Sequence, residues 1–145
     1  MSIKDFDLIF NVNVRGLWLS VSQSMPMLKN ASKISGTARI VLLSSVSALR
    51  PKINSGAYSA SKAAVSQLTR VLAVECAKDN ILVNAIAPGT VDTPMVREQS
   101  SPDKRGNWRP SGPSPLGRIS NPDDIVKVIK FLLDDNSSYV TGTTI

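Results

Sequence analysis

The sequence predicts an α/β fold built on a parallel sheet. Two short, mainly apolar segments, Ala38–Leu43 and Ile81–Ala87, have the composition of strands that are buried on both faces. Longer segments whose apolar residues recur at helical spacing precede, separate and follow these strands. Strands that alternate with helices in this way form βαβ units, in which the strands run parallel.

The first predicted element is a long helix over residues 3–29. Ser2 and Asp5 have the spacing of a capping box at its start. Its apolar positions follow a helical period: Phe6, Ile9, Phe10, Val14, Leu17, Trp18, Val21 and Met25. The segment Asn11–Gly16 contains two asparagines and a glycine, which are unfavourable inside a helix. We therefore expect a kink or a function in this segment, and a second bend near Pro26.

The middle of the chain continues the alternation. Residues 30–37 are polar and predict a loop before the first strand. After the hydroxyl-rich end of that strand, a second helix is predicted over residues 57–78, and its first turns carry small side chains. Asp79 and Asn80 predict the turn into the second strand, which Pro88–Gly89 ends.

The last third of the chain begins with an irregular segment. Residues 90–115 are rich in proline, serine, glycine and charge without a clear period, as in a functional lid or a disordered connection. Asn121 then predicts an N-cap and Pro122 the first position of a helix that reaches about residue 134. Thr143–Ile145 have the character of the start of a third strand.

The composition limits which catalytic and metal-binding groups the chain can use. The chain has 145 residues, the length of one domain, with no histidine and one cysteine. Nucleophilic machinery based on histidine, zinc sites based on histidine or cysteine clusters, and intrachain disulfides are therefore excluded. Acid–base chemistry must use tyrosine, lysine or carboxylates. Cys76 lies on the second predicted helix, and we expect a packed thiol there rather than a reactive one.

Charge and hydropathy bear on partners and location. The apolar runs are far shorter than the roughly 18 residues that a membrane span requires, and the acidic start of the chain does not resemble a secretion signal. We therefore expect a cytoplasmic protein with no membrane partner. The net charge of +6 is dispersed except for one loop group: Arg97, Lys104, Arg105 and Arg109 around Trp108. A solvated loop is the favoured interpretation and contact with an anionic substrate the next, so we expect no nucleic acid partner.

The stretch between the first strand and the second helix concentrates reactive groups. Tyr58 and Lys62 are four residues apart on the predicted helix, so their side chains share one face. An ammonium group beside a phenol favours the phenolate, which lets Tyr58 act as a general acid or base toward an alcohol or a carbonyl. Ser45, at the end of the preceding strand, could hydrogen-bond the same oxygen. The alternative interpretation is an amphipathic helix whose lysine extends into solvent.

Several segments then follow one another in the order and spacing of a known family. They are Asn11–Gly16, Ile40–Ser45, Ala57–Lys62, Val83–Thr93, Pro115–Arg118, Asn121–Ile125 and Tyr139–Gly142. Together they resemble the C-terminal part of a short-chain dehydrogenase/reductase. This resemblance covers nearly the whole chain, and it implies an incomplete part of a doubly wound, Rossmann-like parallel-sheet domain.

The resemblance also implies a catalytic role for four residues. Tyr58 would be the acid/base, and Ser45 would orient the substrate oxygen, for which Ser44 and Ser47 are less well placed. Lys62 would hold the nicotinamide ribose and tune Tyr58, so both residues would also contact the cofactor. Asn13 would hold a water that links Lys62 to solvent.

The implied cofactor is NAD or NADP, and the implied substrate is a small alcohol or carbonyl compound. The backbone after Pro88 and Gly89, including Val91, would face the nicotinamide carboxamide, and Thr93 would hydrogen-bond the cofactor. Residues 92–115 would form a mobile substrate loop. No metal ion is expected, and the full-length form is expected to be a homo-oligomer, a dimer or a tetramer.

One part of the family's pattern is missing from the sequence. Family members begin with a strand and a turn of the form Thr-Gly-x-x-x-Gly-x-Gly that approaches the cofactor pyrophosphate, and the selector of NAD or NADP lies in the same region. We therefore expect residues 1–145 to form a single partial domain without this half and without the family's C-terminal tail. Two interpretations stay open: an oxidoreductase represented by part of its chain, or a non-catalytic remnant that docks on full-length relatives through its two long helices.

Overall fold

Two parallel strands form the centre of the computed structural model, which describes residues 1–50, 53–98 and 115–145. They are β1 (Ala38–Leu43) and β2 (Ile81–Ile86), paired in register from Ala38 with Ile81 to Leu43 with Ile86. The apolar runs that predicted the strands coincide with them, except that β2 ends one residue earlier. The predicted α/β fold with parallel strands is therefore confirmed.

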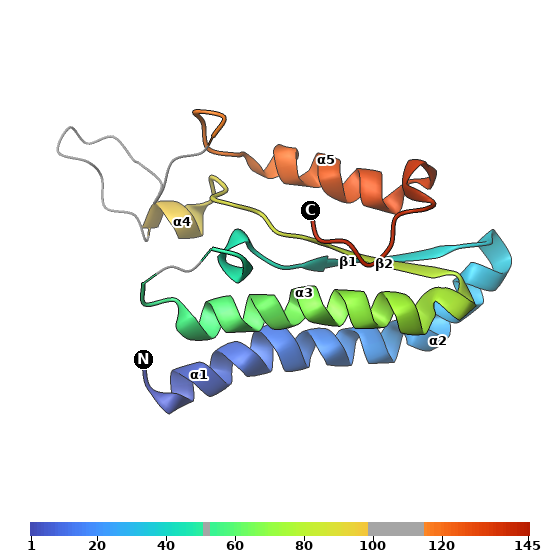
Figure 1. Cartoon of the computed structure of the whole chain (residues 1–145), viewed down its shortest axis with the longest axis horizontal. Helices are drawn as coiled ribbons and strands as arrows, with labels where there is room; N and C mark the ends of the chain where they lie inside the picture. Colours follow the sequence, from blue (N-terminus) through green and yellow to red (C-terminus); the bar gives the residue numbers. More distant parts are fainter. Residues whose placement is uncertain (51–52, 99–114) are drawn as a thin grey trace.

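Helices cover both faces of this sheet (Figure 1). On one face lie α2 (Leu17–Ser35) and α3 (Gly56–Cys76), and on the other lies α5 (Pro122–Leu133). A short 3-10 helix, Ala77–Asp79, follows α3, so the predicted second helix is confirmed within two residues of each end. Among the described helices, none is long and apolar enough to cross a lipid bilayer.

The long N-terminal helix consists of three parts. Helix α1 (Ile3–Phe10) begins with the predicted capping box, in which the Asp5 amide donates to Ser2 Oγ at 3.2 Å and the Ser2 amide donates to Asp5 Oδ2 at 3.0 Å. The next six residues, Asn11–Gly16, form a π-helix, after which α2 continues the chain. The irregularity expected from the two asparagines and the glycine is thus a locally widened helix, a feature that often marks functional sites.

The predicted loop over residues 30–37 is wrong for most of its length. Helix α2 continues to Ser35 and ends at Gly36, whose φ of +82° is the left-handed conformation that a glycine adopts readily. The hydroxyls of Ser32 and Ser35 donate to carbonyls of their own helix at 3.0 and 2.8 Å. Polar residues that appeared to mark a loop are therefore accommodated inside the helix.

Two further elements depart from the predictions. A short helix, α4 (Pro94–Glu98), lies within the segment expected to be irregular. The expected third strand is reduced to a single parallel bridge between Thr144 and Ala85 of β2. Asn84, which is buried, holds this C-terminal segment: its Nδ2 donates to the Val140 carbonyl at 2.8 Å and its Oδ1 accepts from the Thr143 amide at 3.2 Å.

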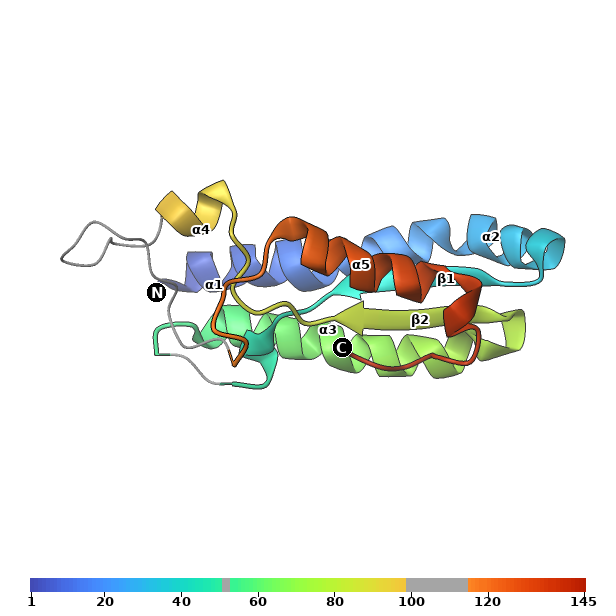
Figure 2. The same ribbon diagram turned by 90° about the horizontal axis from the view of Figure 1, so that it is seen from above.

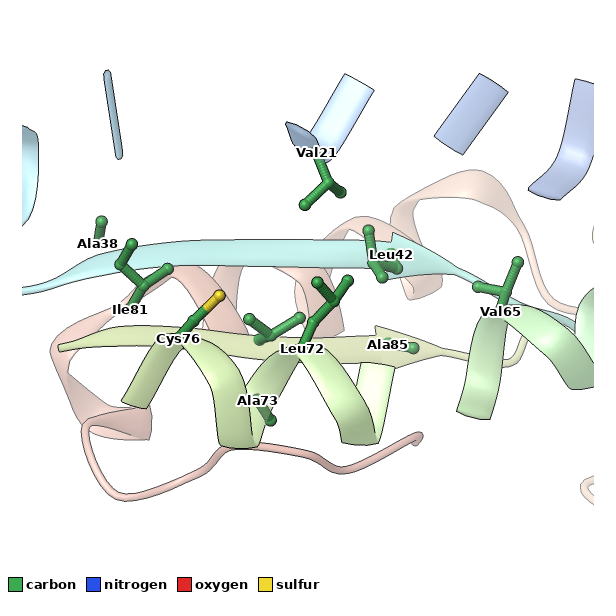
Figure 3. Packing of buried hydrophobic residues seen from close by; sticks show 10 residues of the cluster. Val21, Ala38, Leu42, Val65, Leu72, Ala73, Cys76, Ile81 and Ala85 are labelled. Carbon is green, nitrogen blue, oxygen red and sulfur yellow. The ribbon is translucent and has the colours of Figure 1, made fainter. Parts of the chain in front are cut away.

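The hydrophobic core lies between the strands and the pair α2 and α3 (Figure 3). Val21 of α2, and Leu72 and Cys76 of α3, point towards the strands. Burial raises the pKa of the Cys76 thiol, and the neighbouring carboxylates of Glu75 and Asp79 raise it further. Cys76 is buried, so the expectation of a packed thiol is confirmed.

Candidate active site

The candidate site residues gather at the carboxyl ends of the two strands. Parallel strands place these ends at the same edge of the sheet, where doubly wound folds bind ligands. Figure 2 shows that both strands point towards the end of the molecule that carries α4 and the start of α3. The loops after the strands are joined directly, because the Val46 amide donates to the Pro88 carbonyl at 3.0 Å and the Ser44 amide donates to the Ile86 carbonyl at 2.8 Å.

Two adjacent serines directly follow β1 and make different contacts. Ser44 is 3% exposed, and its Oγ donates to the Lys62 carbonyl at 2.9 Å and lies 2.8 Å from Ser66 Oγ. It therefore ties the strand end to α3. Ser45 caps the short 3-10 helix Val46–Ala48 by accepting a hydrogen bond from the Ser47 amide at 3.2 Å. That bond uses a lone pair, so the Ser45 hydroxyl proton can still be donated to another oxygen.

Tyr58 and Lys62 lie one turn apart near the start of α3. Lys62 Nζ lies 5.9 Å from the centre of the Tyr58 ring, and Tyr58 is 39% exposed. The ammonium also donates to the Leu43 carbonyl, at the end of β1, at 2.8 Å. Burial lowers the pKa of Lys62 because it penalises the charged form. The lysine thus turns back to the sheet edge, in contrast to the alternative in which it extends into solvent.

Asn13 reaches α3 from the π-helix. Its Nδ2 donates to Ser61 Oγ at 3.1 Å, and Ser61 Oγ donates to the Tyr58 carbonyl at 2.7 Å. Ser61 is fully buried, and it is the residue immediately before Lys62. The structure therefore brings Asn13 against the turn of α3 that carries the tyrosine and the lysine. Ser61 was not singled out from the sequence, although a serine three residues after Tyr58 on a slim helix turn was a usable signal.

Four of the six residues predicted to bind the cofactor lie on the segment from the end of β2 to α4. Pro88 accepts the bond from Val46, and a side chain at Gly89 would meet nothing within 4 Å, so the backbone there is accessible. Val91 forms a parallel bridge with Ser120. The Thr93 carbonyl accepts from two amides of α4 at 3.1 and 3.0 Å.

The chemistry of this set fits the nicotinamide end of a dinucleotide. The Lys62 ammonium lies at the end of β1 with the Tyr58 ring 5.9 Å away, and Thr93 and the accessible backbone at Gly89 belong to the segment that follows β2. These are the donors and acceptors that ribose hydroxyls and a carboxamide require. The residues present therefore fit the ribose and the carboxamide of NAD or NADP.

Of the predicted basic loop group, only Arg97 lies within the described residues. Its Nε and one terminal nitrogen contact the Asp92 carboxylate at 2.5 and 2.6 Å, and this pairing lowers the pKa of Asp92. The remaining members, Lys104, Arg105, Trp108 and Arg109, lie outside the described residues, as does most of the predicted substrate loop. The charge of Arg97 is thus already balanced within its own segment.

Comparisons with known proteins agree with this arrangement. A family model described as enoyl-(acyl carrier protein) reductase matches residues 1–145. The 3-oxoacyl-(acyl-carrier-protein) reductase FabG of Thermotoga maritima is 38% identical over 100% of this chain and 56% of its own length. The L-xylulose reductase of Caenorhabditis elegans is 39% identical over 98% of this chain and 55% of its own length.

The solved structures give the same result. The crystal structure of 3-ketoacyl-(acyl-carrier-protein) reductase from Brucella melitensis complexed with NADH is similar with a TM-score of 0.85 at 29% identity. The matched region covers 100% of this chain and 57% of the reductase chain in that crystal structure. The chain thus spans about half the length of the relatives that it matches. A match over all of its residues, in sequence and in fold, shows that the chain belongs to the short-chain dehydrogenase/reductase family.

Proposed function

We propose that this chain is part of an oxidoreductase that transfers a hydride between NAD or NADP and a secondary alcohol or its carbonyl. The observation that carries the proposal is the placement of the Tyr58 phenol one helical turn from the Lys62 ammonium, beside the end of β1. The relatives are oxidoreductases by name, which supports the same class of reaction. Because the chain spans about half their length, the activity is proposed for the whole protein.

Each catalytic residue has a distinct task in this proposal. Ser45 donates its hydroxyl proton to the substrate oxygen and holds it in place. Tyr58 gives a proton to that oxygen during reduction and removes one during oxidation. The positive charge of Lys62 stabilises the phenolate, and its lowered pKa eases the return of a proton. Asn13 holds a water that connects Lys62 to solvent.

The cofactor would supply or accept the hydride when bound. Lys62 and Tyr58 hold its ribose, the backbone at Pro88, Gly89 and Val91 faces its carboxamide, and Thr93 donates a hydrogen bond to it. Residues 92–115 form the substrate loop. We further propose that residues 1–145 are a partial domain, that the pyrophosphate-binding half belongs to the portion of the relatives that this chain does not match, and that the full-length protein is a cytoplasmic homo-oligomer.

The test is a nicotinamide-dependent rate measured with a panel of small carbonyl compounds. We expect Tyr58→Phe in the whole protein to lower the rate by roughly 10²–10⁴-fold, the contribution of general acid–base catalysis. Tyr139 is the second tyrosine and is fully exposed, so Tyr139→Phe is a matched control that should leave the rate unchanged. An undiminished rate in the Tyr58→Phe protein would refute the proposed mechanism.

One observation favours a second candidate, an interaction module that docks on full-length relatives. A cavity of about 310 Å³ lies where the π-helix meets α2 and α3, and it is lined mainly by apolar side chains: Phe10, Asn11, Val14, Arg15, Trp18 and Leu68. It lies away from the strand ends and marks the face of the two long helices. Size-exclusion chromatography with a full-length relative tests this candidate, and elution of the chain as an independent monomer counts against it.

A further inference from the structure

We propose that Ser120 is a positioning residue of the cofactor site, whose hydroxyl fixes the peptide between Thr90 and Val91 so that the Val91 N–H is offered to the nicotinamide carboxamide. The part of this inference that concerns the carboxamide rests on the proposed function. The orientation of the peptide follows from the hydrogen bonds that join residues 90–92 to Ser120.

Ser120 holds the backbone on both sides of Val91. Its Oγ donates to the Thr90 carbonyl at 2.9 Å, and its own carbonyl accepts from the Asp92 amide at 2.8 Å. Val91, between these two residues, forms the parallel bridge with Ser120. A single residue, 30 positions away from Thr90 in the sequence, therefore determines how this short segment of backbone is turned.

These two bonds determine where the polar groups of Val91 point. In a planar trans peptide the C=O and the N–H point in opposite directions. The Thr90 carbonyl is turned towards Ser120, so the Val91 N–H of the same peptide points away from it. The Asp92 N–H is also turned towards Ser120, so the Val91 carbonyl points away as well. Among the described residues, neither of these two groups has a hydrogen-bond partner.

A donor and an acceptor on one side of Val91 match a carboxamide, whose oxygen accepts and whose NH2 group donates. The Val91 N–H suits the carboxamide oxygen, and the Val91 carbonyl suits the NH2 group. If the first peptide were turned over, the Thr90 carbonyl would take the place of the Val91 N–H and would meet the carboxamide oxygen, acceptor against acceptor. The Ser120 hydroxyl opposes this reversal, because the reversal would remove the oxygen to which it donates.

Ser120 is itself held at the start of α5. The next residue, Asn121, caps this helix: its side chain accepts from the Asp124 amide at 3.0 Å, and the Asp124 carboxylate accepts from the Asn121 amide at 3.0 Å. Arg118 donates to the same carboxylate at 2.6 and 3.1 Å. Because α5 packs on the sheet, these bonds place Ser120 on a firm support from which it can orient Val91.

Ser32 provides a control that makes the same kind of bond. It is buried, and its Oγ donates to the Lys29 carbonyl at 3.0 Å within α2. It lies shortly before the start of β1, at the opposite end of the strand from the candidate site. The general cost of removing a hydroxyl from a backbone carbonyl should therefore appear in Ser32→Ala, whereas a loss of nicotinamide binding should not.

The first experiment requires neither cofactor nor turnover. Hydrogen exchange of the Asp92 backbone amide is measured by NMR in the whole protein, in Ser120→Ala, in Ser120→Thr and in Ser32→Ala. We expect exchange about fivefold faster in Ser120→Ala, because one of the two bonds that hold the segment is lost, and unchanged in the other two variants. An unchanged rate in Ser120→Ala would overturn the proposal. If Ser120→Ala does not fold, Ser120→Cys replaces it, since a thiol is only a weak donor.

The second experiment separates the carboxamide from the rest of the cofactor. Dissociation constants are measured for NAD or NADP, for the 3-acetylpyridine analogue of the same dinucleotide, and for ADP-ribose or its 2′-phosphate, which lacks the ring. We expect Ser120→Ala to weaken binding of the first two ligands about fivefold, because both keep the oxygen that the Val91 N–H would meet. Binding of the ligand without the ring should stay unchanged, and Ser120→Thr should bind all three like the whole protein.

Two results would contradict the role of Ser120 at the carboxamide: an equal loss for the ligand without the ring, or undiminished binding of the dinucleotide in Ser120→Ala. Absence of dinucleotide binding in every form would instead count against the proposed function. The exchange of the Asp92 amide would then still decide whether Ser120 holds the backbone around Val91.

Discussion

Ser44 and Ser45 are adjacent, yet replacing the first should lower the stability of the fold and replacing the second should lower the reaction rate. Ser44→Ala removes a buried hydroxyl that contacts the Lys62 carbonyl at 2.9 Å and Ser66 Oγ at 2.8 Å. Two hydrogen bonds at a net value of about 1 kcal/mol each set an upper estimate of about 2 kcal/mol. Ser66 can turn its own proton to the Lys62 carbonyl, four residues back on its helix, which recovers one bond. We therefore expect a loss of about 1 kcal/mol in the free energy of unfolding, or about 4 °C in Tm.

Ser45→Ala should leave the stability nearly unchanged, because the hydrogen bond that the Ser45 hydroxyl accepts, from the Ser47 amide, belongs to a local turn. If Ser45 orients the substrate oxygen, its loss should lower the rate about 100-fold, as for other single donors to a reacting oxygen. The two properties are measured on the whole protein by thermal unfolding and by nicotinamide-dependent turnover, with Ser47→Ala as the control. Loss of turnover in Ser44→Ala at an unchanged Tm, or full turnover in Ser45→Ala, would refute this division of roles.

Three further predictions concern charge and packing. Burial lowers the pKa of Lys62, so between this lowered value and 10.5 the unfolded chain binds more protons than the folded one. The free energy of unfolding should therefore rise with pH across this range. Urea unfolding of Lys62→Met at the same pH values should not show this rise. The Arg118 guanidinium lowers the pKa of Asp124 from 3.8 to about 2. The stabilisation that the Asp124 carboxylate gives to the fold should therefore be complete above pH 3.8 and lost as the pH falls to about 2. Acid unfolding of Asp124→Asn should not show this loss. Leu132 of α5 is fully buried, and Leu132→Ala should cost about 2–5 kcal/mol in urea unfolding, whereas Leu133→Ala, at a position 48% exposed, should cost far less.

The features that could be predicted from the sequence are those that depend on residues close together along the chain. The strands follow from short, mainly apolar runs, and the capping box at Ser2 and the N-cap at Asn121 follow from local residue order that the structure reproduces. The placement of Tyr58 and Lys62 on one helix face follows from the helical period alone. Their chemical roles stay a prediction.

Contacts between distant segments could not be predicted in the same way. The pairing of Asn13 with Ser61 joins residues 48 positions apart, and the bonds of Asn84 to the C-terminal segment span 56 and 59 positions. Asparagine in a helix or in a strand appears unfavourable until its partner is known, because the cost depends on burial and hydrogen bonding in the folded chain. The end of α2 was misplaced for a related reason, since serines can bond to the helix that contains them.

The π-helix at Asn11–Gly16 also accommodates one extra residue without turning α1 away from α3. A π-helical turn holds one residue more than an α-helical turn, so deleting one residue from this segment would restore ordinary helical hydrogen bonding. Each residue of an α-helix accounts for about 100° of rotation and about 1.5 Å of rise. Because the wider turn absorbs its extra residue, this deletion would leave α1 facing α3, whereas a deletion at a regular position near the start of α2 would turn α1 by roughly 100°. Loss of one residue from the π-helix would therefore be tolerated by the packing of α1, and it would change only how the side chains between Asn11 and Gly16 are spaced.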